Sequence, residues 1–196
     1  MLILGHRGAN SPLTGSLSEN SMEAFQQALD LGADGIETDV RSGANGVPVL
    51  CHDPIRDNDT PLASLEELLD WAPDDFLLNL EIKDPRVIPD MVDLMNQYDK
   101  RYLVTSFWHR SVYKFNKEMP HIDCGPIISF SPIFAMLLRG MILAGFTHIV
   151  WDCSIVESDV ISYFPEYQHF AYNVDDYEVQ GFDGIISDDV SLYVEE

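Results

Sequence analysis

The sequence is poor in cysteine, and the three cysteines that it has lie far apart. Cys51, Cys124 and Cys153 show no CxxC spacing. This distribution fits neither a disulfide framework nor a zinc site, because both use closely organised sets of cysteines. We therefore expect three reduced thiols that pack as ordinary small side chains.

Basic residues are also scarce. The chain has 11 lysines and arginines against 33 aspartates and glutamates, which gives a net charge of −22. Such a charge repels nucleic acid and anionic membranes over most of the surface, so nucleic acid is not an expected partner. An anionic substrate would have to be held by local cations or by a metal ion.

Long hydrophobic runs are missing as well. A membrane span needs about 18 apolar residues, and the strongest candidate, residues 132–146 (PIFAMLLRGMILAGF), is interrupted by Arg139 and two glycines. We expect this segment to pack against the core rather than to form a dimer face. Met1 leads directly into an apolar stretch without the basic region of a signal peptide. The expectation is a soluble, cytoplasmic protein with no stable membrane insertion.

The chain length favours one domain. At 196 residues the chain can build one substantial core, and 46% hydrophobic with 22% charged residues is an ordinary globular composition. No linker or low-complexity segment divides it. We therefore expect a single domain over residues 1–196.

Apolar runs alternate along the chain in the manner of strands and helices. Eight core strands are expected at residues 2–6, 34–40, 76–83, 101–107, 124–129, 147–152, 169–174 and 182–188, with a further extended piece at 47–53. Helices are expected at residues 21–32, 64–72, 87–99, 110–119, 132–145 and 157–164, with a short element at 175–181. The helix at 64–72 opens on a capping-box pattern, Ser64 followed by Glu67.

Strands that alternate with helices imply a parallel sheet. Eight such units fit a closed (β/α)8 TIM barrel better than an open, doubly wound sheet, which is the alternative. A barrel typically needs roughly 250 residues, so this α/β fold would be a trimmed version.

Three carboxylates lie on two of the expected strands. Glu37 and Asp39 are two residues apart, so both side chains point to the same face of their strand. They would repel each other unless a cation lies between them. Glu81 adds a third oxygen donor, and such a set suits Mg2+ or Ca2+ better than zinc or copper. The alternative is that one carboxylate is protonated or that one side of the strand faces solvent.

Two histidines lie where a barrel would hold its active site, at the carboxyl ends of the strands. His6 ends the first strand, and His52 follows the extended piece at 47–53. A histidine on each side of a phosphate can act as general base and general acid, while Arg7, Lys83 and a metal ion meet the charge on the phosphoryl oxygens. The remaining histidines are expected to be structural: His109, His121, His148 and His169.

Six sequence blocks carry a family resemblance. They are GHRGAN at residues 5–10, SENSMEAFQQALDLGADGIETDV at 18–40, GVPVLCHD at 46–53, LNLEIK at 78–83, TSF at 105–107, and YNVDD with GFDGIISDD at 172–189. In this order they resemble the signature blocks of the glycerophosphodiester phosphodiesterases, barrel enzymes related to phosphatidylinositol-specific phospholipase C.

The resemblance implies a hydrolase of lipid metabolism that converts a small glycerophosphodiester into an alcohol and a phosphomonoester such as glycerol 3-phosphate. It implies that Glu37, Asp39 and Glu81 bind a divalent metal, Mg2+ or Ca2+, and that His6 and His52 are the acid and base. Arg7 and Lys83 would bind the substrate phosphate. Glu19 and Asn20 would support the site.

One departure from the family pattern concerns the covering of the mouth. Only 28 residues separate His52 from Glu81, where family members typically carry an inserted capping segment. We expect an open mouth, since loops of this kind select the alcohol and exclude water. The natural substrate could then be a different phosphodiester.

Three other functions compete with this interpretation. A non-catalytic barrel that binds a phosphate or sugar phosphate would not need two histidines. A lyase or isomerase that stabilises an enolate on its metal fits Arg7 and the histidines less well than phosphate chemistry does. A purely structural barrel would leave all the strand-end charges without a role.

Overall fold

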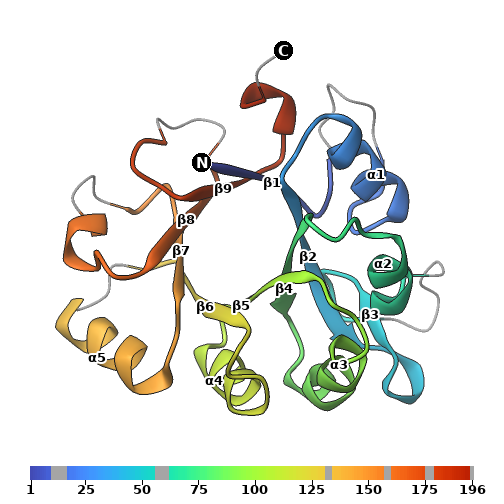
Figure 1. Ribbon diagram of the computed structural model, residues 1–196, viewed down its shortest axis with the longest axis horizontal. Coiled ribbons are helices and arrows are strands. Elements are labelled where there is room, and N and C mark those ends of the chain that lie inside the picture. Colours follow the sequence, from blue (N-terminus) through green and yellow to red (C-terminus); the bar gives the residue numbers. More distant parts are fainter. Residues whose placement is uncertain (10–16, 56–61, 131–133, 157–159, 175–178, 195–196) are drawn as a thin grey trace.

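The computed structural model describes residues 1–9, 17–55, 62–130, 134–156, 160–174 and 179–194 (Figure 1). The strands are β1 (Leu2–His6), β2 (Gly35–Ser42), β3 (Pro48–Leu50), β4 (Leu77–Ile82), β5 (Arg101–Ser106), β6 (Asp123–Ile128), β7 (His148–Asp152), β8 (Gln168–Tyr172) and β9 (Gly184–Ser187). The α-helices are α1 (Met22–Asp30), α2 (Leu65–Trp71), α3 (Ile88–Met95), α4 (His109–Glu118) and α5 (Phe134–Ala144). Short 3-10 helices cover Ala44–Gly46, Pro85–Val87, Val160–Tyr163 and Val190–Leu192.

Eight of these strands form a closed parallel barrel in the order β1-β9-β8-β7-β6-β5-β4-β2, and β1 pairs with β2 to complete the circle. The short strand β3 pairs antiparallel with the end of β2, outside this ring. The helices lie around the outside of the strands (Figure 1). The predicted (β/α)8 barrel is therefore confirmed.

The helix predicted at residues 157–164 is wrong in the part that the structure describes. Residues 157–159 lie outside the described residues, and a single 3-10 turn, Val160–Tyr163, takes the place of a longer helix. Pro165 explains the early end, because proline disfavours the helical conformation in the residue before it. Of the short element expected at 175–181, residues 175–178 lie outside the described residues, and 179–181 are not helical.

Local sequence signals explain where two helices begin. Ser64 and Glu67 form the predicted capping box at the start of α2, with both reciprocal hydrogen bonds present. Ser21 caps α1 through its hydroxyl, which accepts a hydrogen bond from the amide of Ala24. These caps fix the helices that follow β1 and β3.

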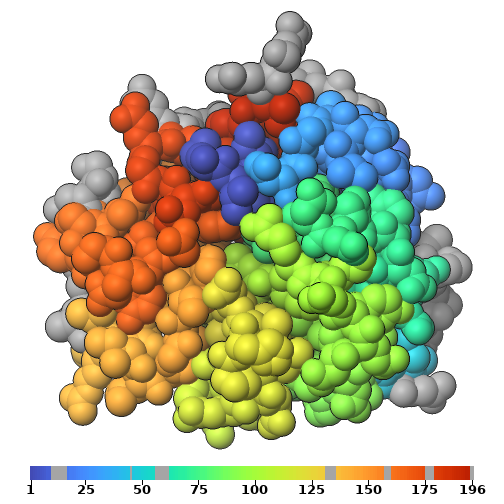
Figure 2. Space-filling view, in the orientation of Figure 1, coloured from blue at the N-terminus to red at the C-terminus, as the bar shows by residue number. Residues whose placement is uncertain are grey.

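The core has an outer layer between strands and helices and a smaller inner layer. The inner layer is built from one apolar side chain of each of seven strands: Leu4, Leu77, Leu103, Ile127, Val150, Phe170 and Ile186. Side chains fill the centre that looks open in the ribbon view (Figure 2). This inner layer forms a floor beneath the carboxyl ends of the strands.

Helix α5 packs on the barrel with only one of its sides. Met141 and Ala144 are buried, as predicted for this segment, whereas Met136 and Leu143 are each 70% exposed. Among the described residues, no helix combines the length and the apolar character needed to cross a bilayer.

Candidate active site and metal centre

The turn after β1 brings the backbone itself into the site. Arg7 has a φ of 54° and Gly8 a φ of 89°, so the chain passes through two left-handed residues directly after His6. A Cβ on Gly8 would lie 2.7 Å from the Ala24 backbone, which makes glycine necessary at this position. The turn directs the Arg7 amide at Glu37, whose Oε2 accepts a hydrogen bond at 3.2 Å.

The three predicted metal ligands lie together on neighbouring strands. One oxygen each from Glu37, Asp39 and Glu81 can be chosen so that all lie within 4.8 Å of one another, and all three residues are buried. Asp39 and Glu81 are direct partners in the pairing of β2 with β4, which places them side by side. The alternative that one side of the strand faces solvent is therefore wrong for these residues.

The electrostatics of this cluster fit a divalent cation. Burial, followed by the charge of Asp39, raises the pKa of Glu37 to about 8, and burial raises the pKa of Glu81 to about 7. Within the described part of the chain, Glu37 Oε1 is buried and accepts no hydrogen bond. A hard cation between these oxygens would satisfy that atom and remove the repulsion, and carboxylate oxygens are the donors that Mg2+ and Ca2+ prefer.

Two cations border the carboxylates. Lys83 Nζ lies 2.8 Å from Glu81 Oε1 and 3.2 Å from Asp39 Oδ1. Arg7 lies on the other side, with Nε 3.3 Å from Asp39 Oδ2 and Nη1 2.7 Å from Glu19 Oε2. Glu19 thus restrains the guanidinium from outside the cluster.

Asn20 positions one of the carboxylates. Its Nδ2 donates to Asp39 Oδ2 at 2.9 Å, and its Oδ1 accepts from Thr38 Oγ1 and from the Asp39 amide. Asn20 is buried and has a φ of 56°, a conformation that asparagine tolerates better than most residues. It acts as a support for Asp39 and is not in the carboxylate cluster itself.

His6 is held by a residue that sequence reasoning missed. Its Nδ1 donates to Asp188 Oδ1 at 2.6 Å, and its Nε2 lies 3.8 Å from Glu37 Oε2. Burial alone would lower the pKa of His6, but the hydrogen bond to Asp188 and then the charge of Glu37 outweigh it, so this pKa is raised. The available signal was the position of Asp188 directly after the last strand, opposite His6.

His52 has a carboxylate partner as well. Its Nδ1 lies 2.9 Å from Asp53 Oδ1, and its backbone carbonyl accepts a hydrogen bond from Arg41 Nε at 2.9 Å. The Arg41 contact ties the loop after β3 to strand β2. Both predicted acid–base histidines therefore pair one ring nitrogen with a carboxylate.

These groups face one cavity of about 180 Å3. It is lined by His6, Arg7, Glu37, His52, Glu81 and Lys83 of the predicted site, with Asp39 just behind. Sequence reasoning missed its aromatic wall, which is formed by Phe107 and Tyr172. The two rings pack edge to face, with their centroids 5.9 Å apart. Lys83 Nζ also lies 5.3 Å from the centre of the Phe107 ring.

Three other histidines have partners away from this cavity. His109 Nε2 contacts the Ile127 carbonyl at 3.1 Å, His148 Nδ1 contacts Thr147 Oγ1, and His169 Nδ1 accepts from Trp151 Nε1. These contacts are what structural histidines would make.

The region between His52 and Glu81 contains little that could cover the mouth. Helix α2 takes up much of it and packs on the barrel through Leu65, Leu68 and Leu69, which are fully buried. Residues 56–61 lie outside the described residues. In the part that the structure describes, this region forms no separate capping structure.

Comparison with known proteins supports the resemblance. The family model described as "Glycerophosphoryl diester phosphodiesterase family" matches residues 6–72. A glycerophosphodiester phosphodiesterase of Caldanaerobacter subterraneus is 28% identical over 162 residues, 63% of this chain and 65% of that protein. A probable glycerophosphodiester phosphodiesterase 2 of Mycobacterium tuberculosis is 31% identical over 133 residues, 56% of this chain and 49% of that protein. Residues 6–72 thus match the family model of the glycerophosphodiester phosphodiesterases, and the chain is similar in sequence to proteins of that name.

Solved structures of this family share the fold over almost the entire chain. The glycerophosphodiester phosphodiesterase of Thermotoga maritima has a TM-score of 0.83 and 21% identity, with 98% of this chain and 96% of that chain covered. An Oleispira antarctica phosphodiesterase, solved in complex with the product sn-glycerol-3-phosphate, has a TM-score of 0.82 and 19% identity, with 98% and 94% covered. The sequence matches, by contrast, span about two thirds or less of the curated relatives' length.

Proposed function

We propose that residues 1–196 form one domain that hydrolyses glycerophosphodiester-like substrates, with a divalent metal, to an alcohol and a phosphomonoester such as glycerol 3-phosphate. The observation that carries this proposal is the convergence of three buried carboxylates, two cations and two carboxylate-paired histidines on one cavity of about 180 Å3. A binding protein for phosphate would need the cations but not the histidine pair.

The carboxylates Glu37, Asp39 and Glu81 would hold Mg2+ or Ca2+. When bound, such an ion supplies positive charge to the phosphoryl oxygens as charge develops on them. Arg7 and Lys83 lie on either side of Asp39 and would orient the substrate phosphate from both sides.

The histidines would move the protons. His6 donates through Nδ1 to Asp188, which leaves Nε2, the atom nearer Glu37, for proton transfer in the cavity. His52 is paired through Nδ1 with Asp53, so its Nε2 is likewise the free nitrogen. One histidine takes a proton from the attacking water or substrate hydroxyl as the new P–O bond forms. The other gives a proton to the alcohol oxygen as the old P–O bond breaks.

The first experiment is a turnover assay of the purified chain with Mg2+, Ca2+ or Mn2+ against glycerophosphocholine, glycerophosphoethanolamine, glycerophosphoglycerol and a chromogenic phosphodiester. We expect release of glycerol 3-phosphate from the glycerophosphodiesters and of the coloured alcohol from the chromogenic diester, and a loss of about 10²–10⁴-fold in rate in His52→Ala. His121→Ala is the matched control, because His121 is exposed and does not line this cavity. A wild-type chain that turns over none of these diesters with any of the metals would refute the proposal.

The same variant distinguishes catalysis from binding. A phosphate-binding barrel would hold glycerol 3-phosphate equally well before and after His52→Ala, and it would show no turnover in either form.

A further inference from the structure

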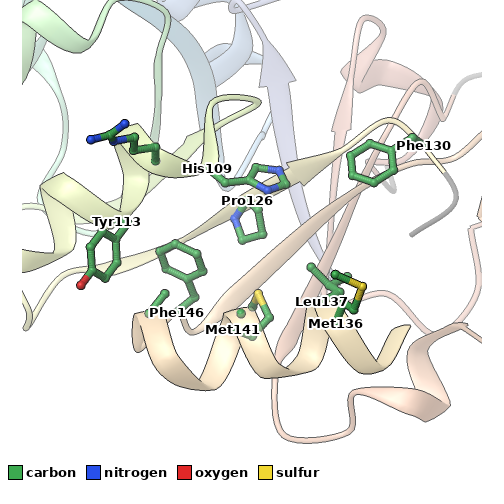
Figure 3. Close-up of a pocket in the computed structure, with 11 residues that line it drawn as sticks. His109, Tyr113, Pro126, Phe130, Met136, Leu137, Met141 and Phe146 are labelled. Atoms are coloured by element: carbon green, nitrogen blue, oxygen red, sulfur yellow. The ribbon is translucent and has the colours of Figure 1, made fainter. Parts of the chain in front are cut away.

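A second, larger cavity lies on the outside of the barrel, between α4 and α5. Its volume is about 670 Å3, and its apolar wall includes Tyr113, Phe130, Met136, Leu137, Met141 and Phe146 (Figure 3). It shares no lining residue with the catalytic cavity. The name α4–α5 face denotes this groove together with the solvent-facing sides of helices α4 and α5.

The outer side of α5 is apolar although it faces solvent. Met136 and Leu143 are 70% exposed and Ile142 is 63% exposed. Met136, Arg139, Gly140 and Leu143 follow the spacing i, i+3, i+4 and i+7, so they form one stripe along the helix. Single exposed apolar residues are ordinary, but a contiguous set next to an apolar groove indicates an interaction surface.

The outer side of α4 is basic. Arg110, Tyr113, Lys114 and Lys117 are exposed and follow the same helical spacing. Together with Arg139, these helices hold four of the 11 lysines and arginines of the chain. Of the residues that the structure describes, no carboxylate lies within 4 Å of any of these four cations.

Acidic residues are missing from the segment that contains α5, although the chain as a whole is acidic. Between Cys124 and Trp151 there is no aspartate or glutamate, whereas the whole chain has 33. Helix α4 carries one acidic residue, the exposed Glu118 at its end, against the four cations of the two helices. The α4–α5 face is therefore locally cationic and apolar on a molecule of net charge −22. An occupant of this face should carry negative charge beside apolar groups.

We propose that the α4–α5 face docks the protein on the surface of an anionic lipid bilayer. The lipid phosphates would be contacted by the four cations of this face, Arg110, Lys114, Lys117 and Arg139. The boundary between headgroups and acyl chains would be entered by the exposed apolar side chains Met136, Ile142 and Leu143. Basic and apolar residues side by side are the composition of peripheral membrane-binding surfaces. This docking needs no membrane-spanning helix.

A second copy of the chain fits this face less well. A two-fold contact places the same surface of both copies together, so the basic side of one α4 would face cations of the other. Lipid phosphates supply the opposite charge.

Salt explains how an acidic protein can approach an anionic surface. At about 0.1 M ionic strength, charges more than about 10 Å apart are largely screened from each other. The distant carboxylates are then hidden from the membrane, while the cations on the contact face are not.

The proposed contact would place the catalytic mouth near the bilayer. Helix α4 begins at the carboxyl end of β5, and Phe130 follows the carboxyl end of β6. Trp108, between Phe107 of the catalytic cavity and His109 of the groove, is 66% exposed.

The test is sedimentation of the purified chain with vesicles of phosphatidylcholine alone or of phosphatidylcholine mixed with phosphatidylglycerol, at about 0.1 M salt. We expect binding to the phosphatidylglycerol vesicles only, and release at about 1 M salt. Arg139→Glu should weaken binding at least about five-fold, because one cation near an anionic surface contributes about a five-fold change in affinity. Leu143→Glu should also weaken binding, because it places a charge where an apolar side chain would enter the bilayer.

Two matched controls lie elsewhere on the surface. Arg101→Glu makes the same charge change as Arg139→Glu, and Leu192→Glu alters an exposed leucine outside this face. Both controls should bind as the wild type does, and all four variants should keep the phosphodiesterase rate on a soluble substrate. Because the vesicle test needs no turnover, its result is independent of the proposed activity.

Three results would overturn the docking proposal. The first is that the wild type does not bind phosphatidylglycerol vesicles. The second is that Arg139→Glu and Leu143→Glu bind these vesicles as tightly as their controls do. The third is a dimer in sedimentation velocity that Leu143→Glu converts to a monomer, which would assign the face to a second copy of the chain.

Discussion

Asp188 Oδ1 lies 2.6 Å from His6 Nδ1, although the two residues are 182 positions apart in the chain. Within the closed barrel β1 pairs with β9 as well as with β2, and the β1–β9 pairing brings the end of the last strand to the end of the first. The carboxylate orients the imidazole so that Nε2 faces the carboxylate cluster. In the proposed mechanism, Asp188 would be a positioning residue that acts through His6.

Replacing Asp188 tests this role. In Asp188→Asn, we expect kcat to fall about 10²-fold, because His6 loses its charged partner and the preferred tautomer. The pKa of His6 should fall as well, since its hydrogen bond to Asp188 now raises that pKa. The limb of the pH–rate profile that belongs to His6 should therefore move to lower pH. A rate loss with an unchanged pH profile would mean that Asp188 is only structural.

Metal binding should stabilise the folded chain. Mg2+ or Ca2+ at about 100 times its Kd should add about 2.7 kcal/mol to the free energy of unfolding, measured by urea titration with and without the metal. In Glu37→Gln this increment should disappear, because one of the three ligands is lost. Without metal, Glu37→Gln should unfold no more easily than the wild type, since glutamine resembles the neutral carboxyl that the raised pKa of Glu37 favours beside Asp39. A metal increment of the same size in both proteins would contradict the assigned site.

Asn20 offers a way to separate side-chain support from backbone strain. Asn20→Gly removes the donor to Asp39 Oδ2 but suits the φ of 56°, whereas Asn20→Ala removes the donor and strains the backbone. Both variants should lose roughly ten- to hundred-fold in metal affinity, measured by isothermal titration calorimetry. Asn20→Ala should be less stable than Asn20→Gly by about 1 kcal/mol. Unchanged metal affinity in both variants would show that Asp39 needs no support.

His169 should make stability depend on pH. It is buried, its Nδ1 accepts from Trp151 Nε1 at 3.0 Å, and its Nε2 lies 2.9 Å from the Phe164 carbonyl. Burial lowers the pKa of His169 below its ordinary value of 6.5, so the folded state keeps this imidazole neutral. Below pH 6.5 the unfolded chain binds a proton that the folded chain does not, and stability falls as the pH falls.

The measurement is the difference in free energy of unfolding between the wild type and His169→Asn. A difference is needed because Glu37 and Glu81 have raised pKa values and act in the opposite direction. Between about pH 7.5 and about pH 5.5, the advantage of the wild type should shrink by about 1 kcal/mol. A constant difference would show that His169 titrates equally in both states.

Features that depend on spacing along one segment of the chain could be predicted from the sequence. The predicted β-strands, the capping box at Ser64 and the clustering of Glu37 with Asp39 depend on spacing along one segment, and the structure shows each of them. The place of Glu81 beside them follows from the parallel barrel, because consecutive parallel strands pair in a fixed register.

Asp188, Phe107 and Tyr172 could not be recognised in the same way. Each reaches the site from a strand that is distant in sequence from β1 and β2, and only closure of the barrel makes them neighbours. Hydrophobic periodicity reports which face of a strand is buried, not which strand lies opposite. The apolar composition of α5 likewise predicts a buried helix, because composition does not show which side of a helix faces the barrel. In the structure, Leu143 on the outer side of α5 is exposed to solvent.

The floor of seven apolar side chains beneath the site makes the catalytic cavity a blind cup. For the proposed reaction, such a cup means that the departing alcohol would leave by the route on which the next substrate arrives. A cup of about 180 Å3 holds little more than a phosphate and a glycerol unit. If the proposed function is right, the rest of the alcohol would stay outside the barrel, where its size and charge meet only the rim, and one site would then accept many different esters.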